Sequence, residues 1–324
     1  MNDKAFISQA RDHVSAASYS PRKLALIHTG VVAVVGLLVA VLNYLLNIGI
    51  GSTAGLSGIG TRTARETAQT VLQLISTVLT PFWAIGFIAA ALQYANRGNP
   101  TPRTLLTGFR CWGPVLRLLL LQFGLYFLVA MAVSQVGSVL YSLSPASSRL
   151  YALMEQLTLE GGDMEQLLSQ LDADVLMDVL LGMLPFLLIP MLSVILYLSY
   201  RLRFAQYLLM TFPRMGAMLA MAQSFKLTKG NCLRLLKLDL RYWWFYLLEV
   251  LVTVLCYGDL LLEVLGVNWG DAGWLASLLF YALALTVQTA LYVWKKPQVL
   301  TTYALFYKSL LPQPENGDQS AVAA

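Results

Sequence analysis

Six long apolar segments constrain the fold of this chain more than any other feature of its sequence. They cover residues 24–48, 68–94, 114–140, 176–201, 235–257 and 273–294. A helix needs about 20 mostly apolar residues to cross the roughly 30 Å hydrocarbon core of a bilayer, and each segment meets that length. Only 12% of the residues are charged, about half the share typical of soluble domains. No alternating strand pattern competes, so the sequence predicts an all-α, polytopic membrane protein with six transmembrane helices.

The same pattern divides the chain into a membrane domain and two ends. The first apolar segment is too long for a signal peptide and no small-residue cleavage site follows it, so we expect it to be retained. Residues 1–23 are predicted to be a cytoplasmic N-terminal segment and 24–311 a single six-helix membrane domain. Residues 142–175 are predicted to form an outer helical loop, and 312–324 a disordered cytoplasmic tail. Prolines should kink or loosen the second and fourth spans, namely Pro81, Pro185 and Pro190.

The distribution of Lys and Arg gives the orientation, because these residues accumulate on the cytoplasmic side of membrane proteins. With six spans, all of the 22 basic residues except Arg62, Arg65 and Arg149 fall on the side of the two termini. Both termini are therefore predicted to be cytoplasmic. The net charge of +5 follows from this anchoring, and we predict no nucleic-acid partner. The aromatic run over residues 242–246 is expected to form a belt at the cytoplasmic interface.

Two cytoplasmic connections carry similar sequences, which indicates an internal repeat. The first reads "LQYANRGNPTPRTLLTGFRCWGPVLRLLLLQ" and the second "AQYLLMTFPRMGAMLAMAQSFKLTKGNCLRLLKLDL". The matched pairs are Gln93 with Gln206, Pro102 with Pro213, Phe109 with Phe225, Gly113 with Gly230, and Arg117 with Arg234. Each connection also carries an amphipathic segment, over 214–229 in the longer copy, suited to the headgroup plane. We predict three hairpin repeats with cytoplasmic interfacial helices, although any basic loop between Leu-rich spans gives a similar pattern.

Three stretches of the chain carry a family resemblance. "GFIAAALQYANRGNPTPRTLLTGFR", "SYRLRFAQYLLMTFPRMGAMLAMAQSFKLTKG" and "TYALFYKSLL" resemble a broad family of uncharacterised bacterial integral membrane proteins, a domain of unknown function. That family looks related to the membrane domain of glycerophosphodiester phosphodiesterases. The resemblance covers most of the chain from Pro81 to Leu311 and implies a multi-pass protein of the bacterial plasma membrane. It implies no activity, because the family has no assigned chemistry.

Sequence motifs for catalysis are absent from the chain. There is no H-E-x-x-H, no G-x-S-x-G and no P-loop lysine motif. The two histidines, His13 and His28, stand in no ligand-spaced cluster. We therefore expect no enzymatic activity, no cofactor and no metal.

Four polar residues on four predicted spans reach similar depths in the membrane: Glu249, Gln122, Gln288 and Ser193. At 1.5 Å per residue they lie roughly 9–12 Å from the cytoplasmic ends of their spans. A charge at that depth costs about 2.5 kcal/mol or more, so Glu249 should face the interior and find partners. It could hydrogen-bond to Gln122 or Gln288 as a structural link, or ionise in a wet cavity and bind a proton or cation. The structural role is favoured, because we find no Lys, Asp or second Glu to match it.

Basic residues at the span edges are candidate contacts for lipid headgroups, namely Arg117, Arg234, Lys226, Lys229 and Arg241. Arg117 and Arg234 are also candidate counter-charges for Glu249. The favoured function is a non-enzymatic plasma-membrane protein that organises lipids or partner proteins. The alternative is a small-solute or ion transporter, or a permease component, that uses the Glu249 layer. The sequence leaves the oligomeric state and the identity of any protein partner open.

Overall fold

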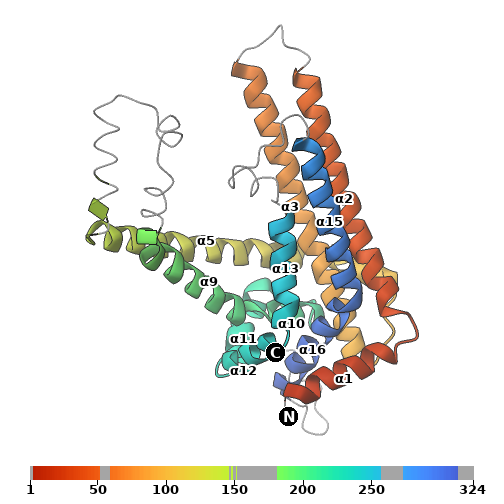
Figure 1. The fold of residues 1–324 in the computed structure, drawn as a ribbon. Helices are drawn as coiled ribbons and strands as arrows, with labels where there is room; N and C mark the ends of the chain where they lie inside the picture. The colour runs from red at the N-terminus through yellow and green to blue at the C-terminus, as the bar shows by residue number, and fades with distance from the viewer. Residues whose placement is uncertain are drawn as a thin grey trace. The chain divides into compact units, whose positions relative to one another are not determined.

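Figure 1 shows the computed structural model of the chain. The residues that the structure describes are 3–51, 59–145, 147–148, 151, 181–256 and 273–312. Every regular element within these residues is a helix, which confirms the predicted all-α class. The predicted outer loop over 142–175 and the predicted tail over 312–324 lie almost entirely outside the described residues. The chain forms two compact units, Met1–Leu116 with Phe204–Ala324, and Arg117–Arg203.

Three helical segments of the described chain are long and apolar enough to cross a membrane: Pro21–Val39, Trp112–Ser142 and Leu181–Thr211. Shorter apolar helices, Leu79–Ala95, Trp243–Leu255 and Ala282–Trp294, overlap parts of the other three predicted spans. A helical membrane protein is consistent with these lengths and compositions. The count of six crossings and the three-repeat arrangement stay predictions.

The larger unit is built on apolar helices that lie side by side (Figure 1). Helix α2 (Pro21–Gly51) packs on α3 (Ile59–Ala95) and on α15 (Gly273–Trp294). Helix α13 (Trp243–Cys256) packs along α15. Helix α16 (Lys296–Leu310) then leaves the end of α15 and packs against α1 and α3.

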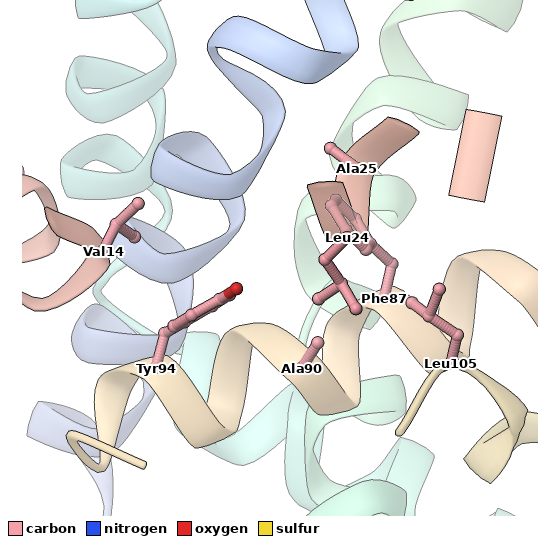
Figure 2. Close-up of a cluster of buried hydrophobic side chains, with 7 residues drawn as sticks. All are labelled: Val14, Leu24, Ala25, Phe87, Ala90, Tyr94 and Leu105. Carbon is pink, nitrogen blue, oxygen red and sulfur yellow. The ribbon is translucent and has the colours of Figure 1, made fainter. Parts of the chain in front are cut away.

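The N-terminal segment forms a helix that the sequence analysis did not predict. Helix α1 (Asp3–Ser15) buries Phe6, Ala10 and Val14, which recur every four residues and therefore share one face. Phe6 packs edge-on against Phe306 of α16, with 5.6 Å between the ring centroids. A cluster of buried side chains lies where α1, α2, α3 and the 3₁₀ helix η1 (Pro102–Leu106) meet (Figure 2). Its members are Val14, Leu24, Ala25, Phe87, Ala90, Tyr94 and Leu105.

Two helices share the segment over 235–257 that is predicted to form the fifth span. Helix α12 (Cys232–Arg241) ends at Tyr242, whose backbone N–H donates to the carbonyl oxygen of Asp239. The apolar helix α13 begins only at Trp243. The charged residues of α12 recur at helical spacing, so this segment is amphipathic and suits a surface rather than a membrane core.

The connections between the apolar helices are also helical, with different lengths in the two matched copies. The longer connection contains α10 (Ala205–Thr211) and α11 (Ala217–Thr228), close to the helix predicted over 214–229. The shorter one contains η1 and the single turn α4 (Thr107–Arg110). The first copy is therefore a compact turn packed on α3, since Leu105 is fully buried.

The smaller unit is described from α5 (Trp112–Ser142), the π-helical turn η2 (Leu184–Leu188) and α9 (Ile189–Leu202). Pro185 lies within η2, and a proline removes one backbone hydrogen bond from a helix. The predicted loosening of the fourth span therefore takes the form of a π turn at this proline. The backbone of Phe186 approaches Gly137 of α5 so closely that a Cβ at Gly137 would clash with it.

We expect Gly86→Ala to destabilise the larger unit by about 1–3 kcal/mol, the usual cost of overpacking. A Cβ at Gly86 would press against the carbonyl oxygen of Leu105, where η1 crosses α3. The measurement is the melting temperature of the purified protein in detergent, followed by intrinsic tryptophan fluorescence. Gly30→Ala is the matched control, because no heavy atom lies within 4 Å of its added Cβ. Equal melting temperatures for the two variants would contradict the close approach of the Leu105 backbone to Gly86.

Candidate functional site

A polar cavity of about 210 Å³ lies along α13 and α15 in the larger unit. Its lining residues are Glu249, Val252, Thr253, Gln288, Leu291 and Tyr292. Both helices contribute positions i, i+3 and i+4, the spacing that places three side chains on one helical face. Each face thus pairs an apolar residue, Val252 or Leu291, with two polar ones. The two helices meet through these faces, so the carboxylate lies at a helix–helix contact.

Tyr292 connects the polar groups of this cavity. Its hydroxyl donates a hydrogen bond to the Glu249 carboxylate and accepts one from the Gln288 side-chain amide. Gln288 precedes Tyr292 by one helical turn on α15, so both reach the same side of α13. Thr253 Oγ1 donates to the Glu249 backbone carbonyl oxygen at 3.0 Å, and its lone pairs remain able to accept a hydrogen bond.

Lys296 is the charge that acts on Glu249. Its Nζ lies 3.4 Å from the centroid of the Tyr292 ring, and the ammonium and the carboxylate interact electrostatically. Burial lowers the pKa of the Lys296 ammonium to about 8, and the Glu249 carboxylate acts in the opposite direction by raising it. Tyr292 therefore contacts both charges: its hydroxyl hydrogen-bonds to the Glu249 carboxylate, and its ring lies under the Lys296 ammonium.

His28 of α2 lies near the same lysine, with which it interacts electrostatically. The ring is only 4% exposed and hydrogen-bonds to the backbone of Trp83 on α3. It also packs against Phe87, with ring centroids 4.8 Å apart. Among the described residues, its buried Nε2 has no hydrogen-bond partner. Four helices, α2, α13, α15 and α16, thus bring ionisable groups toward the α15–α16 junction.

The structure brings together two members of the predicted polar layer, Glu249 and Gln288. Gln122 and Ser193 belong to the smaller unit, on α5 and α9. The Ser193 hydroxyl donates to the Ile189 carbonyl oxygen of its own helix at 2.7 Å. The layer of four residues therefore stays a prediction. The structure places only Glu249 of α13 and Gln288 of α15 beside each other.

The inference that no lysine matches Glu249 is wrong, because Lys296 interacts with it. In the sequence, Lys296 is one of the many basic residues on the side of the two termini, and Tyr292 is not singled out by the polar layer. The sequence does indicate that these residues belong together, because Gln288, Tyr292 and Lys296 recur every four residues and so follow one helical face. Of the two arginines considered as counter-charges, Arg234 lies over the Phe306 ring, 5.7 Å from its centroid.

Helix α12 has three distinct faces, each repeating at positions i, i+3 and i+7. Leu233, Leu236 and Leu240 are exposed, at 72%, 38% and 60% respectively. The next position in each case is basic, which gives a parallel row of Arg234, Lys237 and Arg241. The third row is buried against the protein and consists of Leu235, Leu238 and Tyr242. Successive rows are about 100° apart around the helix, so α12 separates apolar, basic and packed faces.

Helix α11 has a related arrangement. Its small residues face inward, with Ala217, Ala220, Ser224 and Thr228 buried. The large apolar side chains Met218 and Leu219 face outward, at 73% and 51% exposure. Lys226 and Lys229 are exposed at the end of this helix, and Arg117 is exposed on α5 of the smaller unit. All five candidate headgroup contacts are therefore at least partly accessible.

Tyrosine hydrogen bonds hold α12 and the start of α13 on α16. Tyr242 and Thr302 share a hydrogen bond of 2.9 Å, and Tyr246 and Tyr303 share one of 2.7 Å. The Tyr303 hydroxyl also donates to the Asp239 carboxylate of α12. Within the predicted aromatic belt, Tyr242 and Phe245 are buried against the protein and Trp243 is exposed, and the position of the belt at a membrane interface stays a prediction. The hydroxyls turn inward because each finds a partner on α16.

We expect a positive coupling between Glu249 and Lys296 of about 1 kcal/mol in a double-mutant cycle. Glu249→Gln and Lys296→Gln each remove one charge and leave the other uncompensated, so the double variant should lose less stability than the sum. The measurement is the free energy of unfolding of the four proteins in one detergent. The control cycle uses Lys295→Gln, because the Lys295 ammonium lies over the Trp294 ring at 4.9 Å. Equal coupling in both cycles would refute a specific interaction.

No group of three or more metal-ligating side chains occurs in the described part of the chain. A family model described as "Protein of unknown function (DUF975)" matches residues 29–313, which include Glu249, Gln288, Tyr292 and Lys296. No curated protein and no solved structure matches the chain. The predicted resemblance to an uncharacterised family is thus confirmed, while a relation to glycerophosphodiester phosphodiesterases and a bacterial origin stay predictions. The match covers most of the chain, and the protein belongs to this family of unknown function, DUF975.

Proposed function

We propose that this protein is a non-enzymatic integral membrane protein that binds and organises anionic lipids at the cytoplasmic face of the plasma membrane. The observation that carries the proposal is the three-faced helix α12. Its exposed leucine row suits the acyl region, and the adjacent basic row suits lipid phosphates. The third row, which contains Leu235 and Leu238, packs against the protein and so fixes the rotation of α12 about its axis. The leucine row and the basic row are therefore held on the exposed side.

The neighbouring helix supports the same interface. On α11, Met218 and Leu219 add exposed apolar side chains, while Lys226 and Lys229 add exposed basic ones. Each Lys or Arg near an anionic leaflet contributes about 1 kcal/mol to membrane binding. Several such residues held at fixed positions therefore favour anionic over zwitterionic lipid. The occupant of this surface is the lipid headgroup layer, because the basic row is complementary to phosphate.

We expect the triple variant Lys226→Gln, Lys229→Gln, Lys237→Gln to lose most of its co-purifying anionic lipid. At about 1 kcal/mol per lysine, the three substitutions should weaken the preference for phosphatidylglycerol roughly 100-fold. The measurement is the phosphatidylglycerol content of nanodisc-embedded protein after exchange against a mixture with phosphatidylcholine.

The charge-conserving triple variant with arginine at the same three positions is the matched control, and it should retain the lipid. The difference between the glutamine variant and the wild type should shrink as salt increases, because salt screens the exposed charges that only the wild type retains. An unchanged phosphatidylglycerol content in the glutamine variant would exclude this surface as the lipid site. Stoichiometric retention of a protein on the same surface, without anionic lipid, would favour a partner-organising role instead.

A second function, transport of a small solute or ion, is favoured by one specific observation. The cavity beside Glu249 combines an acid, an amide and two hydroxyls on apolar helices. Polar and ionisable groups within membrane-spanning helices are costly, and they commonly mark ion or substrate pathways. Glu249 is the residue that would bind the transported cation or proton.

Glu249→Gln is expected to abolish cation-dependent or proton-dependent flux in proteoliposomes, because the amide cannot carry the negative charge. Flux is followed with a pH-sensitive dye trapped in the vesicles, under an imposed cation gradient. Gln122→Leu is a useful comparison, because it alters a polar residue of the smaller unit without changing charge. Undiminished flux through a folded Glu249→Gln protein would remove the carboxylate from any transport mechanism.

A further inference from the structure

We propose that the cavity beside Glu249 binds a small primary alkylammonium ion, and that its binding expels a proton from Lys296. The proposal rests on the transport function above, since it names the class of solute that this site would take. Each proton that Lys296 releases offsets one positive charge of the bound ligand, so the site gains less net charge than the ligand brings. The proton passes to water or buffer, and the lysine remains as a neutral amine.

The lining of the cavity selects this class of ligand. Glu249, Gln288 and Thr253 offer oxygen acceptors from three side chains, and an ammonium group has three N–H donors. Val252 and Leu291, both at most 5% exposed, supply the apolar part of the wall, where an alkyl chain would lie. A cluster of three or more metal-ligating groups is absent from the described residues, so a divalent metal is not favoured.

Lys296 shows that this site already accommodates an ammonium group. Its Nζ lies over the Tyr292 ring, on the side chain that also hydrogen-bonds to Glu249. Lys296 does not line the cavity itself, so a second cation could enter while the lysine stays in place. Two cations around one carboxylate repel each other, and the buried one that can lose a proton will do so.

The pKa of Lys296 supports this coupling. Burial holds it near 8, and the Glu249 carboxylate is the group that raises it. A bound cation offsets that carboxylate and adds its own repulsion, so the pKa of Lys296 falls further. At about pH 7.5 the lysine then changes from mostly charged to mostly neutral, which releases roughly 0.5 proton or more per bound cation.

The groups that face Lys296 come from three other helices. They are Glu249 of α13, Tyr292 of α15 and His28 of α2. The neighbouring Lys295 is oriented elsewhere, since its Nζ donates to Gln298 and lies over the rings of Trp294 and Trp244. Lys295 therefore provides a matched control within the same junction.

The test is isothermal titration of the full-length protein in nanodiscs with ethylammonium chloride at about pH 7.5. Titration in two buffers of different ionisation enthalpy separates the heat of binding from the protons released. We expect binding to the wild-type protein with proton release, and no binding to Glu249→Gln. Lys296→Met should bind about tenfold tighter or more and release no proton, because the competing charge is gone. Lys296→Arg should bind without releasing protons, since arginine stays charged.

Several outcomes would overturn the proposal. These are the absence of ethylammonium binding to both the wild type and Lys296→Met, equal binding to folded Glu249→Gln, and the same proton release from Lys296→Arg. Equal affinity for tetramethylammonium, which has no N–H donor, or for sodium would also overturn it. Lys295→Met should behave as the wild type does. Should Glu249→Gln fail to fold, Gln288→Leu removes one acceptor and is expected to weaken binding about tenfold.

This titration separates the site from transport. Ethylammonium binding by a protein that shows no flux in proteoliposomes would leave the site intact and remove the transport function. Flux that depends on Glu249, in a protein that binds no ethylammonium, would retain transport and overturn the alkylammonium assignment.

Discussion

The hydrogen bond from Tyr292 to Glu249 is the contact on which the polar interior of the larger unit depends. A carboxylate on an apolar helix is costly unless another helix supplies partners for it. Tyr292 supplies one and is held in turn by Gln288, while the ring of the same tyrosine receives the Lys296 ammonium. One side chain thus lets α13 and α15 pack closely although an acid lies between them.

Helix α16 links this polar interior to the amphipathic surface. It begins at Lys296, which interacts with Glu249, and continues to Thr302 and Tyr303, which hydrogen-bond to Tyr242, Tyr246 and Asp239. Its far end packs against α1 and α3, with the ring of Phe306 against Phe6 of α1, while the Tyr307 ring contacts Phe204 and Tyr207. The two proposed functions therefore involve neighbouring parts of one packed assembly. A change of charge at Lys296 arises on the helix that also positions α12.

Much of the fold was predictable because lipid-compatible helices need long apolar runs, and such runs are visible without any structure. Residues 273–294 coincide with α15, and the helix predicted over 214–229 coincides closely with α11. Two elements were missed for different reasons. Helix α1 is polar overall, so only the four-residue recurrence of Phe6, Ala10 and Val14 marked its packed face. The boundary between α12 and α13 was missed because Leu-rich amphipathic and transmembrane segments have similar composition.

The sequence by itself determined that this chain is helical, apolar and basic at the edges of its apolar segments, because period, length and charge are local properties. It also located Glu249 as a charge that required partners. Only the tertiary structure decided which partners those were, because Tyr292 and Lys296 are more than 40 positions away along the chain. Their meeting depends on how α13 packs against α15 and on where α16 begins, and these are properties of helix contacts rather than of any single segment.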